Sequence, residues 1–408
     1  MEKSMSRRFD PNTAQVLFWG SDWSGHPTSA VHLARGLMRL GYEVYWVNSI
    51  GMRSPRLSFS DADRIRRKVT DSAVKALTAR GRGASSSVSL TEGPRPTGEL
   101  HPFVIPFYRN PAARPLNRKL LSAQLRRAFG SSLGRGKDLV LITTFPNSVD
   151  FVDAFSPVSK VYYVMDDFST FPGVDHAAMT RFEAELFPAV DGAVFAAENV
   201  LQQYRRTAYT TPCRLLTHGV DIDHFRSALH PHPVPEALAG RKGAVIGYVG
   251  LLDERIDQSL IVQIAERFSD CTLLLVGRPT VPVERLAAIP NVILQGAAAY
   301  EDLPAYLSHF DVALMPYVRS ELTEGLNPLK MREYLAAGRK VVATRLPAVV
   351  EYEGVVRTAE NRESFLDAVA DALSSETDSS AVSDAVSPTD GWLHKASELL
   401  DFCGQVAR

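Results

Sequence analysis

The chain has 408 residues, 45% of them hydrophobic and 22% charged, with a formal net charge of −1; these values are typical of a globular protein of two or three domains. The polar start, residues 1–15, lacks the apolar segment of a secretory signal, and no apolar run is long enough to span a bilayer. Cys213, Cys271 and Cys403 lie far apart, which argues against a disulfide framework or a zinc site. We therefore expect a cytoplasmic protein.

Strand and helix patterns alternate in the first half of the chain, which predicts a parallel sheet covered by helices. The expected strands are 15–20, 42–48, 103–107, 138–146, 160–167, 192–197 and 214–220. The expected helices are 28–41, 61–77, 117–129, 176–187 and one that begins at Glu198. Residues 78–100 are typical of a loop, and the proline- and histidine-rich segment 228–243 is the predicted interdomain linker.

The alternation then starts again, which predicts a second domain of the same kind. The expected strands are 244–250, 272–277, 292–296, 311–317 and 340–347, and the expected helices are 257–268, 303–310, 324–338 and 391–405. The predicted fold class is α/β, with two Rossmann-like domains facing a cleft. The predicted parts are an N-terminal domain (1–227), the linker (228–243), a C-terminal domain (244–388), and a helix (389–408) that returns to the N-terminal domain.

One region of the chain is strongly basic. Residues 53–137 hold 18 Lys and Arg against 5 Asp and Glu, whereas residues 138–408 hold 22 against 37. The expected helices 61–77 and 117–129 carry clustered cations, a pattern that suits an anionic membrane surface at about 1 kcal/mol per basic residue. The alternative is a solvated basic face packed on its own domain. We do not expect nucleic acid as a partner, because no basic-aromatic module is recognisable.

The segment "EGLNPLKMREYLAAG" (324–338) predicts a helix between two strands. Asn327 suits the N-cap, Pro328 the first helical position, and Gly338 the residue after the helix. The helix should begin at the carboxyl edge of the sheet, where open α/β folds bind ligands. Its free amides, its dipole and Lys330 suit a phosphate group. The alternative is a capped surface helix with a solvated lysine.

Three motifs that would indicate other nucleotide chemistry are incomplete. "GSDWSGHP" (20–27) has the glycine spacing of a P-loop but ends in His-Pro instead of Lys-Ser/Thr. No G-x-G-x-x-G follows the first strand, and the second strand ends near Asn48 instead of an acidic residue, so a dinucleotide cofactor is not expected. The D-x-D pairs at 61–63 and 221–223 are too short to specify a metal. We therefore expect no cofactor and no metal.

Three segments together resemble glycosyltransferases with the two-domain GT-B fold. "NPLKMREYLAAG" resembles their donor-nucleotide segment, "THGVDIDHF" (217–225) the end of their N-terminal domain, and "GYVGLLDERID" (247–257) the start of their donor domain. The resemblance covers most of 140–375 and is closest to bacterial polysaccharide enzymes of the xanthan glucuronosyltransferase and teichuronic acid glycosyltransferase type. It implies metal-independent transfer of a sugar from a UDP-linked donor to a glycan, lipid-linked or small-molecule acceptor.

The resemblance also implies roles for residues at the start of the predicted helix. Lys330 would bind the diphosphate together with the amides that follow Asn327, beside Leu329. Glu333 lies one turn further along the same face and would accept hydrogen bonds from ribose hydroxyls. Retaining relatives carry two glutamates eight residues apart here, and Glu324 is one place away from that position. The retaining signature is therefore imperfect, and both an inverting and a retaining enzyme remain open.

Three more donor-side residues follow from the same comparison. Gly250, after the first strand of the second domain, would let the loop approach the phosphates closely. Tyr317 would line the base or sugar pocket at the end of its strand. Arg255 is a second candidate cation, with pairing to Asp253 or Asp257 as the alternative.

The acceptor side is expected around "VMDDFST" (164–170). Asp166 ends a strand at the expected ligand edge and matches the general base of the xanthan-type enzymes. Asp167 would orient it or be solvated, and a structural cap is the alternative for both. Asp22 and His26, after the first strand, are further acceptor-side candidates.

Two other functions remain open at this point. A nucleotide-sugar epimerase with the same two domains would need no acceptor. A non-catalytic sugar-nucleotide sensor or membrane-bound scaffold would bind the donor without turnover. For each of these functions we expect a cytoplasmic protein, with a peripheral place on the inner face of the cell membrane as the second option.

Overall fold

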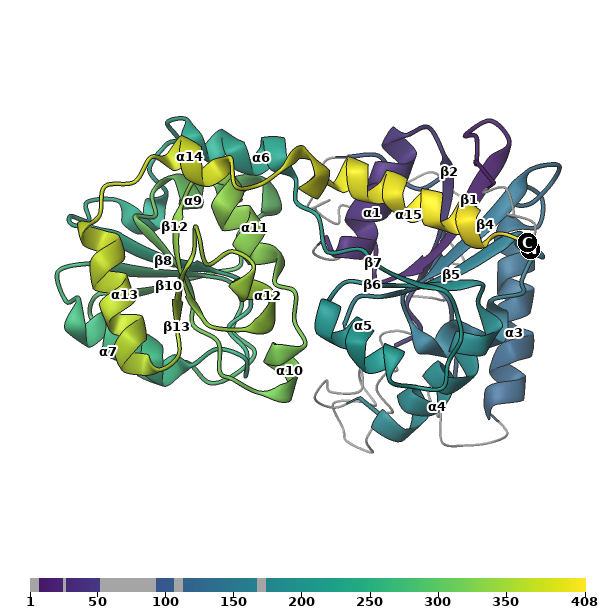
Figure 1. The fold of residues 1–408 in the computed structure, drawn as a ribbon, viewed down its shortest axis with the longest axis horizontal. Helices are drawn as coiled ribbons and strands as arrows, with labels where there is room; N and C mark the ends of the chain where they lie inside the picture. Colours follow the sequence, from purple (N-terminus) through teal and green to yellow (C-terminus); the bar gives the residue numbers. More distant parts are fainter. Residues whose placement is uncertain (1–6, 25–26, 52–92, 106–112, 167–173) are drawn as a thin grey trace, which may run out of the picture. The chain divides into compact units, whose positions relative to one another are not determined.

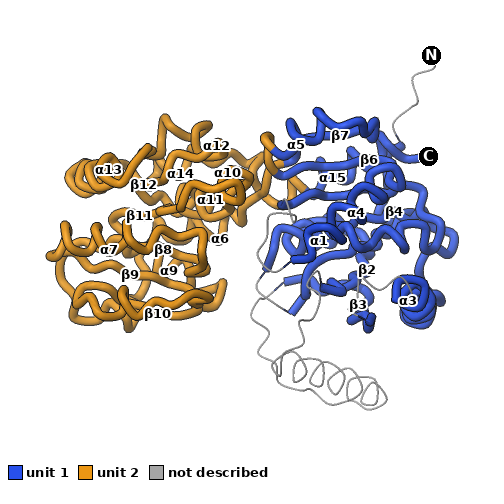
Figure 2. Tube along the Cα trace, turned by 90° about the horizontal axis from the view of Figure 1, so that it is seen from below, with its two compact units in different colours: residues 1–196, 200–216, 396–408 blue, residues 197–199, 217–395 orange. Residues whose placement is uncertain are grey.

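The structure is a computed structural model, and it describes residues 7–24, 27–51, 93–105, 113–166 and 174–408 (Figure 1). The chain forms two compact units (Figure 2). Unit 1 comprises residues 1–196, 200–216 and 396–408, and unit 2 comprises 197–199 and 217–395. Each unit contains one parallel sheet with helices on both sides, so the predicted α/β class with two Rossmann-like domains is confirmed.

Within the described part of unit 1, the sheet has seven parallel strands in the order β3-β2-β1-β4-β5-β6-β7. Its central strands are apolar and fully buried, as expected where helices cover both faces. The strands are β1 (Ala14–Gly20), β2 (Glu43–Asn48), β3 (Gly98–Leu100), β4 (Asp138–Thr143), β5 (Ser159–Val164), β6 (Gly192–Phe195) and β7 (Cys213–Leu215). The helices named here are α1 (Ser29–Arg39), α3 (Ala113–Phe129), α4 (His176–Leu186), α5 (Glu198–Arg205), α15 (Trp392–Val406) and the 3-10 helix η1 (Pro146–Phe151).

The edge of this sheet next to α3 differs from the prediction. The expected strand 103–107 is wrong over its described part, and the expected loop 78–100 ends in β3. Phe103 instead bonds through its backbone N–H and C=O to the side chain of Gln124 on α3, and Ile105 does the same with Asn117. These side-chain amides take the place of a neighbouring strand. The predicted helix 61–77 lies outside the described residues.

The last turns of α15 pack against the sheet of unit 1. The Ser159 hydroxyl donates a hydrogen bond of 2.8 Å to the carbonyl of Cys403, and Arg408 forms an ion pair with Asp191. Gly192 has no side chain where the ring of Phe402 lies against β6. The first part of the helix, up to Lys395, groups with unit 2.

The sheet of unit 2 has six parallel strands in the order β10-β9-β8-β11-β12-β13, so the strand order reverses between β8 and β11. The strands are β8 (Val245–Val249), β9 (Thr272–Val276), β10 (Val292–Gly296), β11 (Val312–Met315), β12 (Lys340–Thr344) and β13 (Arg357–Ala359). The helices are α6 (Ile222–Arg226), α7 (Gln258–Arg267), α8 (Glu284–Ala287), α9 (Leu303–Ser308), α10 (Glu321–Glu324), α11 (Leu329–Ala336), α12 (Pro347–Val350), α13 (Arg362–Ser374) and α14 (Ser379–Ser383).

Residues 217–243 belong to unit 2, although the sequence assigned them to the end of the N-terminal domain and to the linker. The reason is apolar burial: Val220, Phe225 and Leu238 lie in the same hydrophobic cluster as the strands of unit 2. The pattern had also not predicted β13, which extends this sheet beyond β12, or the helix α13 that follows it.

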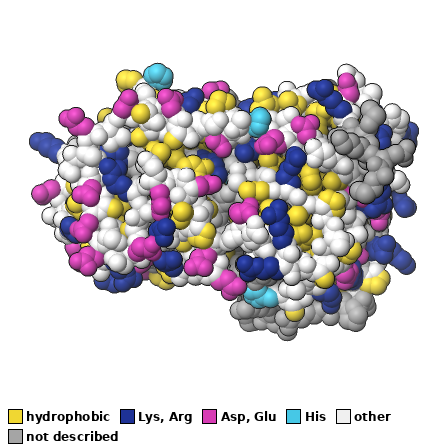
Figure 3. All heavy atoms as spheres, in the orientation of Figure 1, with side chains coloured by type: hydrophobic (Ala, Val, Ile, Leu, Met, Phe, Trp, Pro, Cys, Tyr) yellow, Lys and Arg dark blue, Asp and Glu magenta, His cyan; other side chains and the backbone are white. Residues whose placement is uncertain are grey.

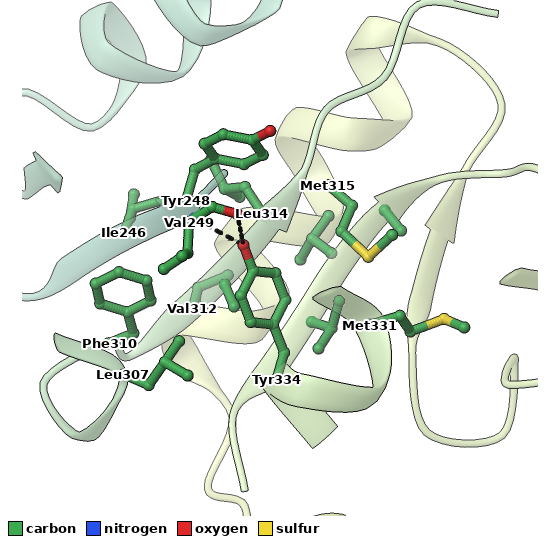
Figure 4. Close-up of a cluster of buried hydrophobic side chains, with 14 of the residues drawn as sticks. Ile246, Tyr248, Val249, Leu307, Phe310, Val312, Leu314, Met315, Met331 and Tyr334 are labelled. Atoms are coloured by element: carbon green, nitrogen blue, oxygen red, sulfur yellow. Dashed lines mark hydrogen bonds between the residues drawn. The ribbon is translucent and has the colours of Figure 1, made fainter. Parts of the chain in front are cut away.

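A hydrogen-bonded tyrosine lies within the core of unit 2 (Figure 4). The Tyr334 hydroxyl accepts a hydrogen bond of 2.8 Å from the backbone N–H of Val249 and donates one of 3.3 Å to its carbonyl. The buried side chains of Met315 and Met331 come from β11 and α11 on one side of the tyrosine ring. These contacts hold α11 against the end of β8.

Among the described helices, none combines the length and the apolar character needed to cross a membrane.

Candidate functional site

The carboxyl edge of the unit 2 sheet gathers most of the predicted donor-side residues. When the six strands of unit 2 are numbered 1 to 6 from β8 to β13, their order in the sheet is 3-2-1-4-5-6. The order therefore reverses between β8 and β11. In open α/β sheets, ligands bind outside the carboxyl ends of the strands at such a point. Gly250 directly follows β8, and the segment from Tyr317 to α11 follows β11. The fold therefore brings the two predicted segments to the same edge.

The start of α11 differs by one residue from the prediction. Pro328 is the N-cap, and the helix begins at Leu329, so the assignment of Asn327 as N-cap is wrong. The Asn327 side-chain oxygen instead accepts a hydrogen bond of 2.6 Å from Arg332, whose guanidinium is almost fully buried. Gly338 has a φ of +70°, as predicted for the residue after a helix. Lys330 remains in the first turn of α11.

The side chain of Lys330 crosses directly over Gly250. Gly250 has a φ of +147°, and a Cβ at this position would overlap the end of the Lys330 side chain. The ammonium lies 6.0 Å from the ring centroid of Tyr248 on β8, within the range of a cation–π contact. The Gly250 N–H donates to the carbonyl of Val276, at the end of β9. The absence of a side chain at Gly250 therefore places a cation at the carboxyl edge of β8.

Replacing Gly250 by alanine is expected to destabilise the protein by about 1–3 kcal/mol, because the residue would keep a strained φ and displace Lys330. Urea unfolding of the variant measures this change. Gly354→Ala is the matched control, because nothing lies within 4 Å of a Cβ there. Equal stability of both variants would contradict the described contact between Gly250 and Lys330.

Glu333 follows Lys330 by one turn on α11, and its carboxyl group is largely surrounded by protein atoms. This burial raises the pKa of Glu333 to about 7, against the opposing attraction of Lys330. The carboxyl can therefore exchange a proton near neutral pH. Its neighbour Tyr334 is held on the end of β8, which fixes the helix that carries both Lys330 and Glu333.

The titration of Glu333 is expected to lower stability as the pH rises from about 5 to 7. In this window the native carboxyl keeps its proton while the unfolded chain, with a pKa of 4.5, has released it. The free energy of unfolding should therefore fall by roughly 1 kcal/mol per pH unit. Glu333→Gln should flatten this slope, while Glu363→Gln, an exposed control, should keep it. Urea unfolding across this pH range tests it, and equal slopes in all three proteins would contradict a raised pKa.

Arg255 and Tyr317 both lie near this edge. Arg255 is already ion-paired, however, and Tyr317 is buried. Arg255 pairs with Asp253 at N–O distances of 2.5–3.0 Å, while Asp257 caps α7 and pairs with Arg362. Of the two partners left open for Arg255, the structure shows Asp253. Tyr317 is 5% exposed and belongs to the core. Leu329, half-buried, begins α11.

The sequence analysis did not identify a group of buried polar side chains at α11, namely His218, Arg332 and Lys395. Burial, together with the charges of Arg332 and Lys395, lowers the pKa of His218 to about 3, so its imidazole is neutral. Arg332 also approaches Glu351 at 3.5 Å, and its Nε has no hydrogen-bond partner among the described residues. The sequence could have indicated both residues, because His218 lies in the segment "THGVD" and Arg332 lies in the predicted helix 324–338.

In unit 1 the predicted acceptor-side residues lie at the carboxyl edge as far as they are described. Asp166 follows β5 and is half-buried. Asp22 follows β1, is exposed, and accepts hydrogen bonds from the backbone N–H and hydroxyl of Ser24, so it shapes its own loop. Asp167 and His26 lie outside the described residues. The described residues bring no three His, Cys, Asp or Glu side chains together as metal ligands.

A small hollow of about 20 Å³, room for about one water molecule, lies at the same edge of unit 1. Its lining residues follow β2, β3 and β4 or come from α3 and α4: Ile50, Val104, Arg114, Asn117, Asn147, Asp150, Phe151 and Phe182. The Arg114 guanidinium is bonded to Asp150 and Glu185. Asn147 donates to the carbonyl of Gly51 at 2.7 Å, and its buried side-chain oxygen has no partner among the described residues. Half of the lining side chains are therefore apolar, and the Arg114 guanidinium and the Asn147 amide nitrogen are already hydrogen-bonded.

Comparisons with known proteins point to one class. Residues 243–375 match the family model "Glycosyl transferases group 1". A Bacillus subtilis (strain 168) protein described as a teichuronic acid biosynthesis glycosyltransferase, TuaH, is 35% identical over 146 residues, which are 35% of this chain and 36% of that protein. The match thus spans about a third of the relative's length.

Solved structures show the same fold over nearly the whole chain. Sucrose-phosphate synthase from Thermosynechococcus elongatus has a TM-score of 0.64 at 14% identity, covering 94% of this chain and 97% of that one. Anabaena HepE in complex with UDP and glucose has a TM-score of 0.56 at 13% identity, covering 96% and 95%. An Escherichia coli trehalose-6-phosphate structure bound with UDP-2-fluoro glucose has a TM-score of 0.63 at 13% identity, covering 96% and 99%.

The chain therefore has the GT-B fold, and its second unit contains a group 1 glycosyltransferase domain. The matched range contains β8, Gly250 and the whole of α11.

Proposed function

We propose that this protein transfers a sugar from a UDP-linked donor to a hydroxyl group of a glycan or lipid-linked acceptor. The observation that carries the proposal is Lys330, held across Gly250 at the reversal point of the sheet in the matched domain. An ammonium and the free amides at the start of α11 suit a diphosphate. UDP is the proposed nucleotide because two of the similar structures contain UDP or a UDP sugar.

The donor would be held by groups on one helix and two loops. Lys330 and the amides after Asn327 would bind the diphosphate, and Glu333, three residues after Lys330, would accept hydrogen bonds from the ribose hydroxyls. Arg255 is already paired with Asp253, so it would help to orient the donor but would add little net positive charge. These groups stabilise the charge that develops on the leaving diphosphate, so the proposed reaction needs neither a metal ion nor a cofactor.

We assign the role of general base to Asp166. In an inverting transfer, this carboxylate would take the proton of the acceptor hydroxyl while that oxygen attacks the anomeric carbon from the face opposite the diphosphate. The bond from the anomeric carbon to the diphosphate breaks, and UDP leaves. The position of Asp166 at the carboxyl end of β5 supports this role. The hollow near Asn147 would receive a small part of the acceptor, because it lies at the same sheet edge as Asp166 and half of its lining is apolar.

The proposed setting is polysaccharide biosynthesis on the cytoplasmic side of the membrane. It is supported by the similarity to a protein described as a teichuronic acid biosynthesis glycosyltransferase. Contact with an anionic membrane surface through the basic region 53–137 is part of the proposal. Residues 53–92 and 106–112 of that region lie outside the described residues, and α3 is its main described element.

Product analysis with a panel of UDP sugars tests the proposed reaction. Transfer predicts release of UDP and a glycosylated product only when a suitable acceptor, such as a polyprenyl-phosphate-linked sugar, is added. An epimerase would convert the UDP sugar to its isomer without acceptor, and a binding protein would show neither transfer nor slow hydrolysis. The reported relatives are transferases and synthases, which favours transfer over epimerisation.

A further inference from the structure

The outward face of α3 is cationic and carries no acidic residue. The helix contains five basic residues; Arg114 lines the hollow of unit 1 and, among the described residues, is the only one of the five with an ion-pair partner. Lys119, Arg126 and Arg127 are exposed and, among the described residues, none of them has an ion-pair partner. Together with Leu116 and Ala123 they have the spacing of one helical face. We call these five residues the outer face of α3.

Two exposed apolar side chains accompany the cations: Leu116 belongs to the outer face of α3, and Phe103 lies on the segment bonded to α3. Leu116 is 46% exposed within it, and Phe103 is 45% exposed. The backbone of Phe103 is fixed to α3 by two hydrogen bonds to Gln124, at 2.9 and 2.8 Å. The structure thus fixes the backbone of Phe103 against α3 at Gln124, three residues before Arg127, while the Phe103 ring stays partly exposed. In Figure 3, Lys and Arg side chains lie over the part of unit 1 where Figure 1 draws α3.

From this arrangement we propose that the outer face of α3 docks on an anionic lipid surface. The cations attract the phosphates of acidic lipids, and Phe103 and Leu116 enter the boundary between headgroups and acyl chains. A soluble polyanion would satisfy the cations but would leave the two apolar side chains in water. Lipid is the partner that matches both observations.

The same helix connects this surface to the hollow. Arg114 and Asn117 on its inward side line the hollow, while Lys119, Arg126 and Arg127 point outward. Docking through α3 would therefore bring the hollow within one helix diameter of the membrane. This last step rests on the proposed function, because it identifies the hollow as the place of the acceptor. It narrows the acceptor to one that is attached to a lipid.

Vesicle flotation of the full chain tests the docking without any activity measurement. The probes are vesicles of phosphatidylglycerol with phosphatidylcholine, and vesicles of phosphatidylcholine alone, at about 0.05 M and about 0.5 M salt. We expect binding to the acidic vesicles at low salt only. Each removed cation should weaken it about fivefold, so the triple variant Lys119→Gln, Arg126→Gln, Arg127→Gln should lose about a hundredfold.

Two further variants separate lipid from other partners. Phe103→Ser with Leu116→Ser should weaken vesicle binding about tenfold or more and leave binding to soluble polyglutamate unchanged. The matched charge control is Arg39→Gln, Arg205→Gln, Arg206→Gln, three exposed arginines on α1 and at the end of α5, and it should bind as the wild type does. Circular dichroism melting checks that all variants are folded.

Three results would overturn the proposal. They are no binding of the wild type to acidic vesicles at low salt, equal losses in the α3 and control triple variants, and an unchanged affinity after removal of Phe103 and Leu116. A separate failure of UDP to bind would count against the proposed function and would leave the vesicle result intact.

Discussion

Replacing Lys330 by methionine is expected to weaken UDP binding about 10- to 150-fold. Methionine keeps an unbranched side chain across Gly250 but removes the ammonium, so the loss is that of a charged hydrogen bond, about 1.5–3 kcal/mol. With UDP at about 100 times its dissociation constant, the wild type should gain about 2.7 kcal/mol of stability. The same UDP concentration should stabilise the variant much less. A thermal-shift series with UDP, GDP, dTDP, CMP, ATP and NAD measures both the effect and the nucleotide preference.

The matched control for this experiment is Lys242→Met, at an exposed lysine of the same unit before β8. It changes the net charge by the same amount and should leave the UDP shift unaltered. If no nucleotide stabilises the wild type, or if Lys330→Met responds to UDP as the wild type does, the start of α11 is not the diphosphate site. The glycosyltransferase proposal would then lose the observation on which it rests.

Asp166→Asn is expected to lower turnover by a factor of about 10²–10⁴ while UDP binding stays unchanged. The amide keeps the size and polarity of the side chain but cannot take the proton of the acceptor hydroxyl, which is the contribution of a general base. Rates of acceptor-dependent UDP release give the turnover, and the thermal shift with UDP gives donor binding. The separation of the two readouts distinguishes a lost base from a damaged fold.

Asp401→Asn, at an exposed aspartate on α15 in the same unit, is the control and should retain full turnover. Asp22→Asn is informative as a comparison, because Asp22 lies at the same sheet edge but its carboxylate is bonded to Ser24. Unchanged turnover in Asp166→Asn would remove this residue from the mechanism. A loss in Asp22→Asn with none in Asp166→Asn would transfer the role to the loop after β1.

Lys330 and Glu333 lie three residues apart on α11, and their interaction indicates how the proposed donor site would respond to pH. Burial raises the pKa of Glu333 to about 7, while Lys330, three residues earlier, favours the charged carboxylate. A bound diphosphate would draw the ammonium toward itself and weaken that attraction. Donor binding and the protonation of Glu333 are therefore expected to be coupled, which the unfolding measurements with Glu333→Gln can detect when repeated with UDP.

Local patterns in the sequence were sufficient for the fold class and for the position of the segment 324–338 at the sheet edge. Buried parallel strands are apolar throughout, so "AVIGYVG" and "DVALMPY" are recognisable without any partner, and Gly338 marks the end of α11. The order of these segments, with Lys330 in the first turn of the helix predicted after the strand 311–317, placed the cation at the carboxyl edge. These features depend on neighbours within a few residues, which is why the sequence reveals them.

Features that depend on distant residues could not be read in this way. Asn327 matches the composition of an N-cap, but Arg332 takes its oxygen, and the helix starts at Leu329. Arg255 had two acidic neighbours in the sequence, and the fold commits one of them to α7 and Arg362. Residues 103–105 have the apolar character of a strand, yet two side chains on α3 occupy their hydrogen bonds. Each of these outcomes is a competition for one hydrogen-bond partner. The competitor of Asn327 lies five residues away, where burial fixes the Arg332 side chain, and the competing side chains in the other two cases lie 12 to 105 residues from the groups that they bind.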